Sequence, residues 1–78
     1  MEVKMYSGIR TLVEVHGDLS DVLIPAGTRG TVVECFNNPE AYAVDLAIPD
    51  SSLVGGFRYE NVALSPDQFE VIEAISRQ

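Results

Sequence analysis

The chain has 78 residues, the size of one small domain, and its hydrophobic fraction of 46% is typical of a folded protein rather than a disordered one. Twelve acidic residues against five basic ones give a formal net charge of −7, which repels phosphate backbones and therefore disfavours nucleic-acid binding. No apolar run approaches the roughly 20 residues that span a bilayer, and residues 1–6 lack the apolar segment of a signal peptide. We therefore expect a cytoplasmic protein with no membrane contact, built as a single domain over residues 1–78, with residues 1–6 and 74–78 prone to fraying.

The first predicted strand covers residues 9–16, where side chains of different polarity alternate with a period of two. Its odd-numbered residues form the face that we expect to be buried: Ile9, Thr11, Val13 and Val15. His16, the only histidine, belongs to the opposite face.

A long connection follows over residues 17–26, and its end is predicted to be extended because a partly β-branched run precedes Pro25. Four residues of this loop are candidates for contact with a protein partner: Asp18, Leu19, Asp21 and Leu23. Alternatively, the apolar residues of the loop fold back onto the open end of the sheet, since large exposed apolar patches are uncommon on monomers.

Gly27 and Gly30 are predicted to bracket a tight turn in which glycine gives access to positive φ. A strand is predicted over residues 31–36. We expect Val33 and Cys35 to be its most buried residues, with Val32 second. Cys35 is the only cysteine, so it cannot form an intramolecular disulfide, and it is expected to pack as a small apolar side chain.

The second half of the chain predicts a meander of strands. Residues 37–40 read as a turn, and residues 42–48 as a strand with Val44 and Leu46 in the core and Asp45 on the outer side. A glycine-containing loop then leads to a twisted or edge strand over residues 57–64. Ser65 and Pro66 favour one 3₁₀ turn before a short closing strand at residues 69–72.

Three aromatic residues of the two meander strands are further candidates for partner contact: Tyr42, Phe57 and Tyr59. Exposed aromatic side chains can hold an extended peptide. The alternative is that these rings serve core and sheet packing, because aromatic side chains bury large areas.

The segment Gly27-Thr28-Arg29-Gly30-Thr31-Val32-Val33 resembles the turn and strand of small SH3-like barrels, including modules of the KOW type. Together with residues 42–46 and 64–72, it resembles a bacterial family catalogued as domain of unknown function 4926. The resemblance implies an all-β fold, a small SH3-like barrel of about five antiparallel strands with one 3₁₀ turn before the last strand. The family has no established activity that would assign a role to a residue.

The chain offers little for catalysis or metal binding. One histidine and one cysteine are too few for a zinc or copper site, and strand parity places His16 and Cys35 on different faces. Asp18 and Asp21 lack the rest of a calcium-loop pattern. We therefore expect no enzyme, no metal and no cofactor.

The expected function is a non-enzymatic protein-interaction module, and the acidic composition favours a basic protein partner, as in an immunity or antitoxin-like role. Three alternatives stay open at this point: a KOW-like nucleic-acid-binding module, an accessory subunit of a larger enzyme, and a homo-oligomer.

Overall fold

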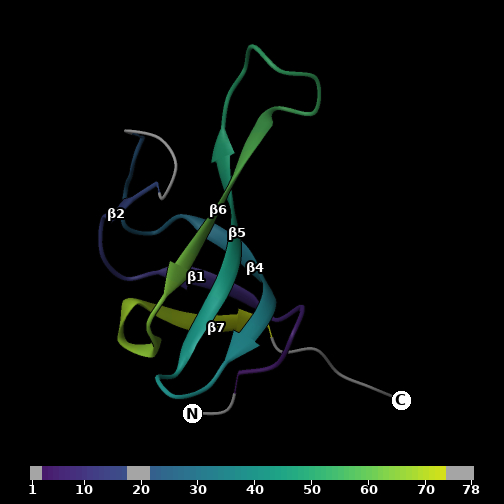
Figure 1. Cartoon of the computed structure of the whole chain (residues 1–78). Coiled ribbons are helices and arrows are strands. Elements are labelled where there is room, and N and C mark those ends of the chain that lie inside the picture. Colours follow the sequence, from purple (N-terminus) through teal and green to yellow (C-terminus); the bar gives the residue numbers. More distant parts are fainter. Residues whose placement is uncertain (1–2, 18–21, 74–78) are drawn as a thin grey trace.

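The computed structural model describes residues 3–17 and 22–73. Five strands form one antiparallel sheet in the order β6-β5-β4-β1-β7, and two short strands form a separate hairpin (Figure 1). The elements in chain order are β1 (Gly8–Thr11), β2 (Val15–His16), β3 (Leu23–Ile24), β4 (Arg29–Phe36), β5 (Ala41–Pro49), β6 (Phe57–Leu64), the 3₁₀ turn η1 (Pro66–Gln68) and β7 (Phe69–Glu73). The predicted all-β class and the 3₁₀ turn before the last strand are confirmed.

Strands β6 and β7 are the two edges of the large sheet. No ladder joins them in the described part of the chain, so the sheet is open there rather than a closed barrel. The prediction that residues 57–64 form an edge strand is confirmed. No helix among the described residues has the length and apolar character needed to cross a membrane.

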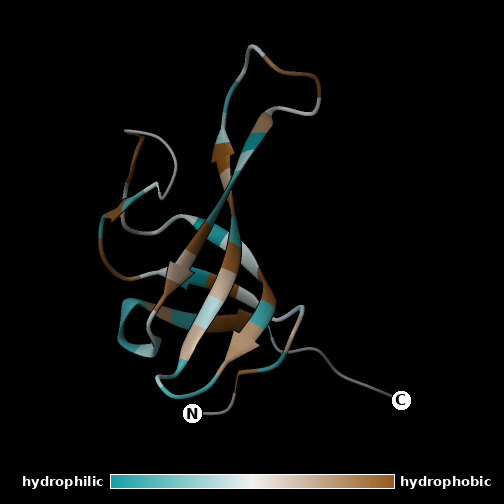
Figure 2. Cartoon of the chain, in the orientation of Figure 1, coloured by the Kyte–Doolittle hydropathy of each residue, from teal (hydrophilic) through white to brown (hydrophobic). Residues whose placement is uncertain are grey.

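The core lies on one face of the sheet and beneath the β2–β3 hairpin. Its buried apolar side chains come from β1 to β7 and from the segment before β1: Val3, Ile9, Val15, Ile24, Val32, Tyr42, Val44, Leu46, Val62, Leu64 and Phe69. The rings of Tyr42 and Phe69 meet edge to face, with centroids 5.5 Å apart. Val44 and Leu46 are fully buried, as predicted, and apolar and polar residues alternate along the strands in Figure 2.

The first predicted strand is wrong in its length and in one of its core residues. The chain leaves the large sheet after Thr11, bends at Leu12 and Val13, and resumes extended structure only at β2. The amide of Leu12 donates to the carbonyl of Gln68 at 2.8 Å, and the pairing with β7 goes no further because Gln68 belongs to the 3₁₀ turn η1. Ile9, Thr11 and Val15 are buried, but Val13 is 41% exposed because it lies in the bend.

The predicted burial order in β4 is also wrong. Val32 pairs with Val44 but Glu34 pairs with Ala43, so Val33 is the extra residue of a β-bulge. Val32 is fully buried because it pairs with the core residue Val44, whereas Val33 in the bulge is only partly buried. The bulge inverts the alternation of the residues that follow it. Cys35 returns to the core side opposite Tyr42 but lies one residue from the end of β4 and is exposed.

Gly27 and Gly30, the two glycines of the predicted turn, are required for different structural reasons. Gly27 lies in a turn with φ +91°, as predicted. Gly30 lies within β4, where an added Cβ would come within 2.7 Å of the Asp45 carbonyl oxygen and 2.8 Å of Leu46 Cδ2. Close approach of β5, rather than a positive φ, therefore requires glycine at position 30.

Residues 3–7 are held against the sheet. The amide of Tyr6 donates to Val32 O at 2.6 Å, and the amide of Val32 donates to Ser7 O at 3.0 Å. Val3 contributes to the core. The remaining residues that we expected to fray, 1–2 and 74–78, lie outside the described part of the chain.

Hairpin β5–β6 projects from the rest of the molecule (Figure 1). Its two strands pair as far as Pro49 and Phe57, and the amide of Asp50 donates to Gly56 O at 2.8 Å across the base of the loop. Val54 at the tip is fully exposed. The projecting hairpin places the first residues of β6 beyond the core.

Candidate functional site

The face of the large sheet opposite the core, which we call the outer face, carries the candidate site. Strand pairing aligns one residue from each of the five strands in a row across it: Asn61, Asp45, Thr31, Gly8 and Glu73. Paired residues project to the same side of a sheet, so these five residues share the outer face. The row brings together residues that are far apart in the sequence.

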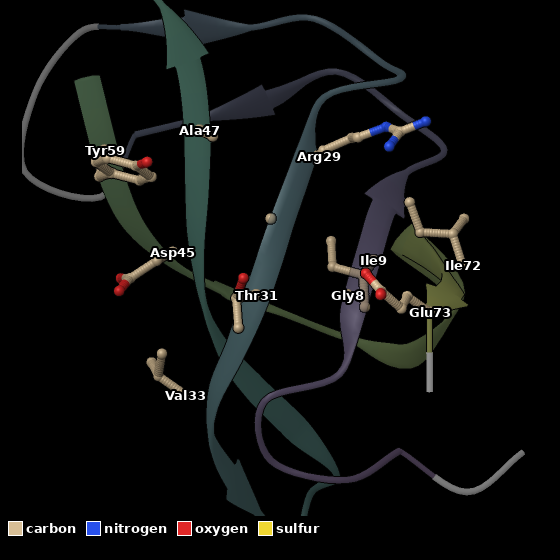
Figure 3. Close-up of a pocket in the computed structure, with 11 residues that line it drawn as sticks. Gly8, Ile9, Arg29, Thr31, Val33, Asp45, Ala47, Tyr59, Ile72 and Glu73 are labelled. Carbon is tan, nitrogen blue, oxygen red and sulfur yellow. The ribbon is translucent and has the colours of Figure 1, made fainter. Parts of the chain in front are cut away.

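A hollow of about 390 Å³ lies over the middle of this face. We call it the outer groove, and it is lined by Gly8, Ile9, Arg29, Gly30, Thr31, Val33, Asp45, Ala47, Tyr59, Ile72 and Glu73 (Figure 3). Small residues on β1, β4 and β5 form its middle, while Tyr59 lies to one side and Ile72 to the other in Figure 3. The groove therefore exists because small residues occupy the central strands.

Two carboxylates line the outer groove from opposite sides. Asp45 Oδ1 accepts a hydrogen bond from Asn61 Nδ2 at 2.7 Å, which fixes the side chain on β5. Glu73 lies over Gly8, because a Cβ added at Gly8 would be 3.2 Å from Glu73 Cβ and 3.5 Å from Glu73 Oε1. The absence of a side chain at Gly8 thus lets the Glu73 carboxylate lean inward from the sheet edge.

Thr31 lies between these two carboxylates in the row. It pairs with Asp45 on one side and with Gly8 on the other. Neighbouring strands are about 5 Å apart, so a cation placed above Thr31 would be flanked by Asp45 and by the Glu73 carboxylate over Gly8. The arrangement concentrates negative charge at the middle of the groove.

Tyr59 supplies an aromatic surface beside the carboxylates. It pairs with Ala47, and it is 65% exposed. The small side chain of Ala47 leaves one side of the ring uncovered by β5. An exposed aromatic face attracts a cation through its quadrupole.

Arg29 stands at the end of the outer groove and has no ion-pair partner among the described residues. It pairs across β1–β4 with Arg10, whose guanidinium binds the Glu70 carboxylate. Arg58, the other described arginine, binds Glu60 at 3.2 Å. Arg29 thus faces an arginine whose charge is already paired with Glu70.

A second hollow of about 350 Å³ adjoins the outer groove, and we call it the proline hollow. It is lined by Pro25, Ala26, Gly27, Thr28, Arg29, Ala47, Pro49 and Phe57. Arg29 and Ala47 line both hollows, so the two are neighbours on the outer face. Apart from Arg29 and Thr28, its lining is apolar or glycine.

The structure separates the predicted aromatic residues into two groups. Phe57 and Tyr59 are both exposed, lie two residues apart on β6 and share the outer face. Tyr42 is buried against Phe69, so it does not belong to this surface. Its hydroxyl donates to the Glu40 carboxylate, and this hydrogen bond, together with burial, raises the pKa of Tyr42 to about 12.

The loop candidates do not join the outer face in the described part of the chain. Leu23 is 52% exposed and lies on β3, in the separate hairpin, while its neighbour Ile24 is fully buried. Asp18, Leu19 and Asp21 lie outside the described residues. His16 and Cys35 lie in different sheets, and no group of three or more His, Cys, Asp or Glu side chains suited to a metal ion occurs in residues 3–17 and 22–73.

Sequence reasoning missed five contributors to the site: Gly8, Arg29, Thr31, Asp45, which was predicted only to lie on the outer side of its strand, and Glu73. The available signal was the small size of Gly8 and Thr31 at outward positions, but their neighbours depend on the register between strands that are distant in sequence. Glu73 in particular reaches the site only because β7 returns beside β1.

No family model, curated protein or solved structure matches the chain. The resemblance to domain of unknown function 4926 gains no support from these comparisons and stays a prediction.

Proposed function

We propose that the chain is a non-enzymatic protein-interaction module that binds a basic segment of a partner protein in the outer groove. An immunity or antitoxin-like role against a basic protein is one form of this function. The observation that carries the proposal is the position of Asp45 and Glu73 on either side of Thr31, with the exposed ring of Tyr59 beside them.

A lysine or arginine side chain of the partner fits this arrangement. Over Thr31 its cationic group would lie between the two carboxylates, and its stem would lie against Tyr59. A cation–π contact at an exposed site is worth about 0.5–1 kcal/mol. An exposed ion pair contributes up to about 1 kcal/mol.

A single bound cation is not enough for a stable complex. One cation contributes about 1–3 kcal/mol in total, which is far below the roughly 8 kcal/mol of a micromolar complex. The partner therefore makes further contacts on the outer face. The net charge of −7 adds long-range attraction, which speeds association and weakens as salt is raised.

The finer fold is part of the same proposal: we infer that the sheet is that of a small SH3-like barrel. Consecutive strands β4, β5 and β6 are neighbours, the first strand lies beside the last, and a 3₁₀ turn precedes the last strand. This strand order is compatible with a curved sheet whose edge strands β6 and β7 approach each other, as in a small barrel. Slow hydrogen exchange of amides on the free edge of β6 supports closure in solution, and fast exchange along that whole edge contradicts it.

The functional proposal is tested by NMR titration of the ¹⁵N-labelled chain with a defined probe, the peptide acetyl-Gly-Ser-Arg-Ser-Gly-amide. The matched control peptide carries citrulline, which has nearly the shape of arginine but no charge. The arginine peptide is expected to shift the amide signals of Thr31, Asp45, Tyr59 and Glu73, with the citrulline peptide shifting them far less.

A Tyr59→Ser variant is expected to lose most of these shifts, while Tyr6→Ser, which removes another exposed tyrosine, keeps them. Equal shifts with citrulline contradict the proposal. So do shifts that fall mainly on acidic residues away from the outer groove, such as Glu14 and Asp67, because general charge attraction then explains the binding.

A further inference from the structure

The proline hollow differs in chemistry from the outer groove. Pro25, Pro49, Ala26 and Phe57 give it apolar walls, and Phe57 is 46% exposed at its side. No carboxylate lines it, and its one charged lining residue is Arg29, at the border with the outer groove. A basic side chain entering here would meet a like charge, whereas an apolar one would cover Phe57 and the two prolines.

The spacing of the two hollows matches that of an extended peptide. Tyr59 lines the outer groove and Phe57 lines the proline hollow, two residues apart on the same face of β6. This separation is about 7 Å along a strand. In an extended ligand, side chains that point the same way also recur every second residue, about 7 Å apart.

We propose that the partner segment is extended and carries a basic residue and an apolar residue two positions apart, the first bound in the outer groove and the second in the proline hollow. The inference rests on the proposed function and names the chemistry of the partner. The two carboxylates decide the occupants: Asp45 and Glu73 line only the outer groove and select the cation there, whereas the proline hollow has no carboxylate to offset the charge of Arg29.

A second copy of this chain suits the site less well than a basic partner. Each copy carries a net charge of −7, so two copies repel, whereas a basic segment is attracted. Charge complementarity therefore favours a different protein as the occupant.

The test is a series of NMR titrations with seven-residue peptides of serine and glycine that each contain one arginine. Leucine is placed one, two or three positions after the arginine, or one, two or three positions before it, and the reference peptide has no leucine. Two peptides place leucine two positions from the arginine, one before it and one after it. One of these is expected to bind at least about five-fold more tightly than the reference peptide, because much of the leucine side chain is buried. It is also expected to shift the amide signals of Gly27, Thr28 and Phe57.

Two variants test whether the affinity gained from leucine comes from the proline hollow. Phe57→Ser is expected to abolish the leucine gain while keeping the arginine-dependent shifts at Thr31 and Asp45. Ala26→Gln, at an exposed turn position, narrows the hollow from its other side and is expected to reduce the gain as well. Val54→Ser is the matched control, because Val54 is a fully exposed apolar residue at the tip of the same hairpin.

The outcomes separate the two proposals. If arginine shifts the outer groove but no leucine spacing adds affinity, or every spacing adds equally, or the gain survives in Phe57→Ser and Ala26→Gln, the further inference is wrong and the proposed function stands. If replacing arginine by citrulline changes nothing, both are wrong.

Discussion

A single methyl group at position 30 would collide with the neighbouring strand. A Cβ there would lie 2.7 Å from a backbone oxygen of Asp45 and less than 3 Å from the side chains of Val44 and Leu46. The backbone of β5 cannot move aside without opening the ladder. We predict that Gly30→Ala lowers the free energy of unfolding by about 3 kcal/mol, measured by urea denaturation.

Gly27→Ala is the matched control for this prediction. Gly27 has φ +91° but nothing within 4 Å of an added Cβ, so alanine there costs only the backbone strain of about 1–2 kcal/mol. An equal or larger loss in Gly27→Ala would contradict the packing explanation of Gly30.

The contribution of Tyr42 to the free energy of unfolding is lost at alkaline pH. Its hydrogen bond to Glu40 and its burial favour the neutral phenol and raise its pKa from 10.0 to about 12 in the folded state. Because the folded pKa is above the unfolded one, this stabilisation is complete below about pH 10 and is lost as the pH rises from 10 to 12. The wild-type chain is therefore predicted to lose its stability advantage over Tyr42→Phe across this window.

Urea unfolding of both proteins at several pH values checks this prediction, because groups other than Tyr42 affect the two proteins alike. A stability difference that stays constant between about pH 8 and pH 12 would show that the phenol does not carry the dependence.

At the scale of elements, Thr11 ties the end of β1 to the turn between β3 and β4. Its hydroxyl donates to Pro25 O at 3.3 Å and accepts from the amide of Thr28 at 3.1 Å, and the residue is 1% exposed. Thr11→Val keeps the shape but leaves the Thr28 amide without this acceptor. We predict a loss of about 1–2 kcal/mol in the free energy of unfolding, measured by urea denaturation.

Thr31→Val is the matched control for Thr11→Val, since it makes the same substitution at an exposed residue of the outer face. Its effect on stability is expected within about 0.5 kcal/mol. Equal effects at both positions would mean that the hydroxyl of Thr11 does not support the turn.

The regular part of the fold could be predicted because its alternation is unbroken. Residues 57–64 became an edge strand, and Val44 and Leu46 became core residues, as their period of two indicates. Ser65 and Pro66 likewise marked the 3₁₀ turn. In these segments, local sequence and tertiary packing favour the same structure.

The irregular part could not be predicted, because neighbouring strands decide it. Val32 and Val33 are identical side chains, so the sequence does not reveal that a bulge at Val33 inverts the pattern of β4. Val13 continues the apolar alternation of β1, yet the pairing with β7 stops before it because the partner segment is the 3₁₀ turn η1. Both errors come from pairings that are distant in sequence.

Only the part of the candidate site that lies on a single strand, β6, could be predicted from the sequence. Phe57 and Tyr59 share a face of β6 by simple alternation, so the sequence alone predicts that they lie together. Arg29, Asp45 and Glu73 meet through the register of three further strands, so their grouping required the sheet order β5-β4-β1-β7.

At the scale of the whole molecule, an acidic chain presents two adjoining hollows of different chemistry on one sheet face. We propose that this face binds a basic partner. Affinity capture from the native host with the tagged full chain tests it most directly, comparing wild type, Tyr59→Ser and Tyr6→Ser by quantitative mass spectrometry.

We expect wild type and Tyr6→Ser to capture one or a few proteins of net positive charge that are released by raised salt and strongly depleted with Tyr59→Ser. Capture of the same proteins in equal amounts by Tyr59→Ser would contradict it, as would recovery of nucleic acid that depends on Tyr59.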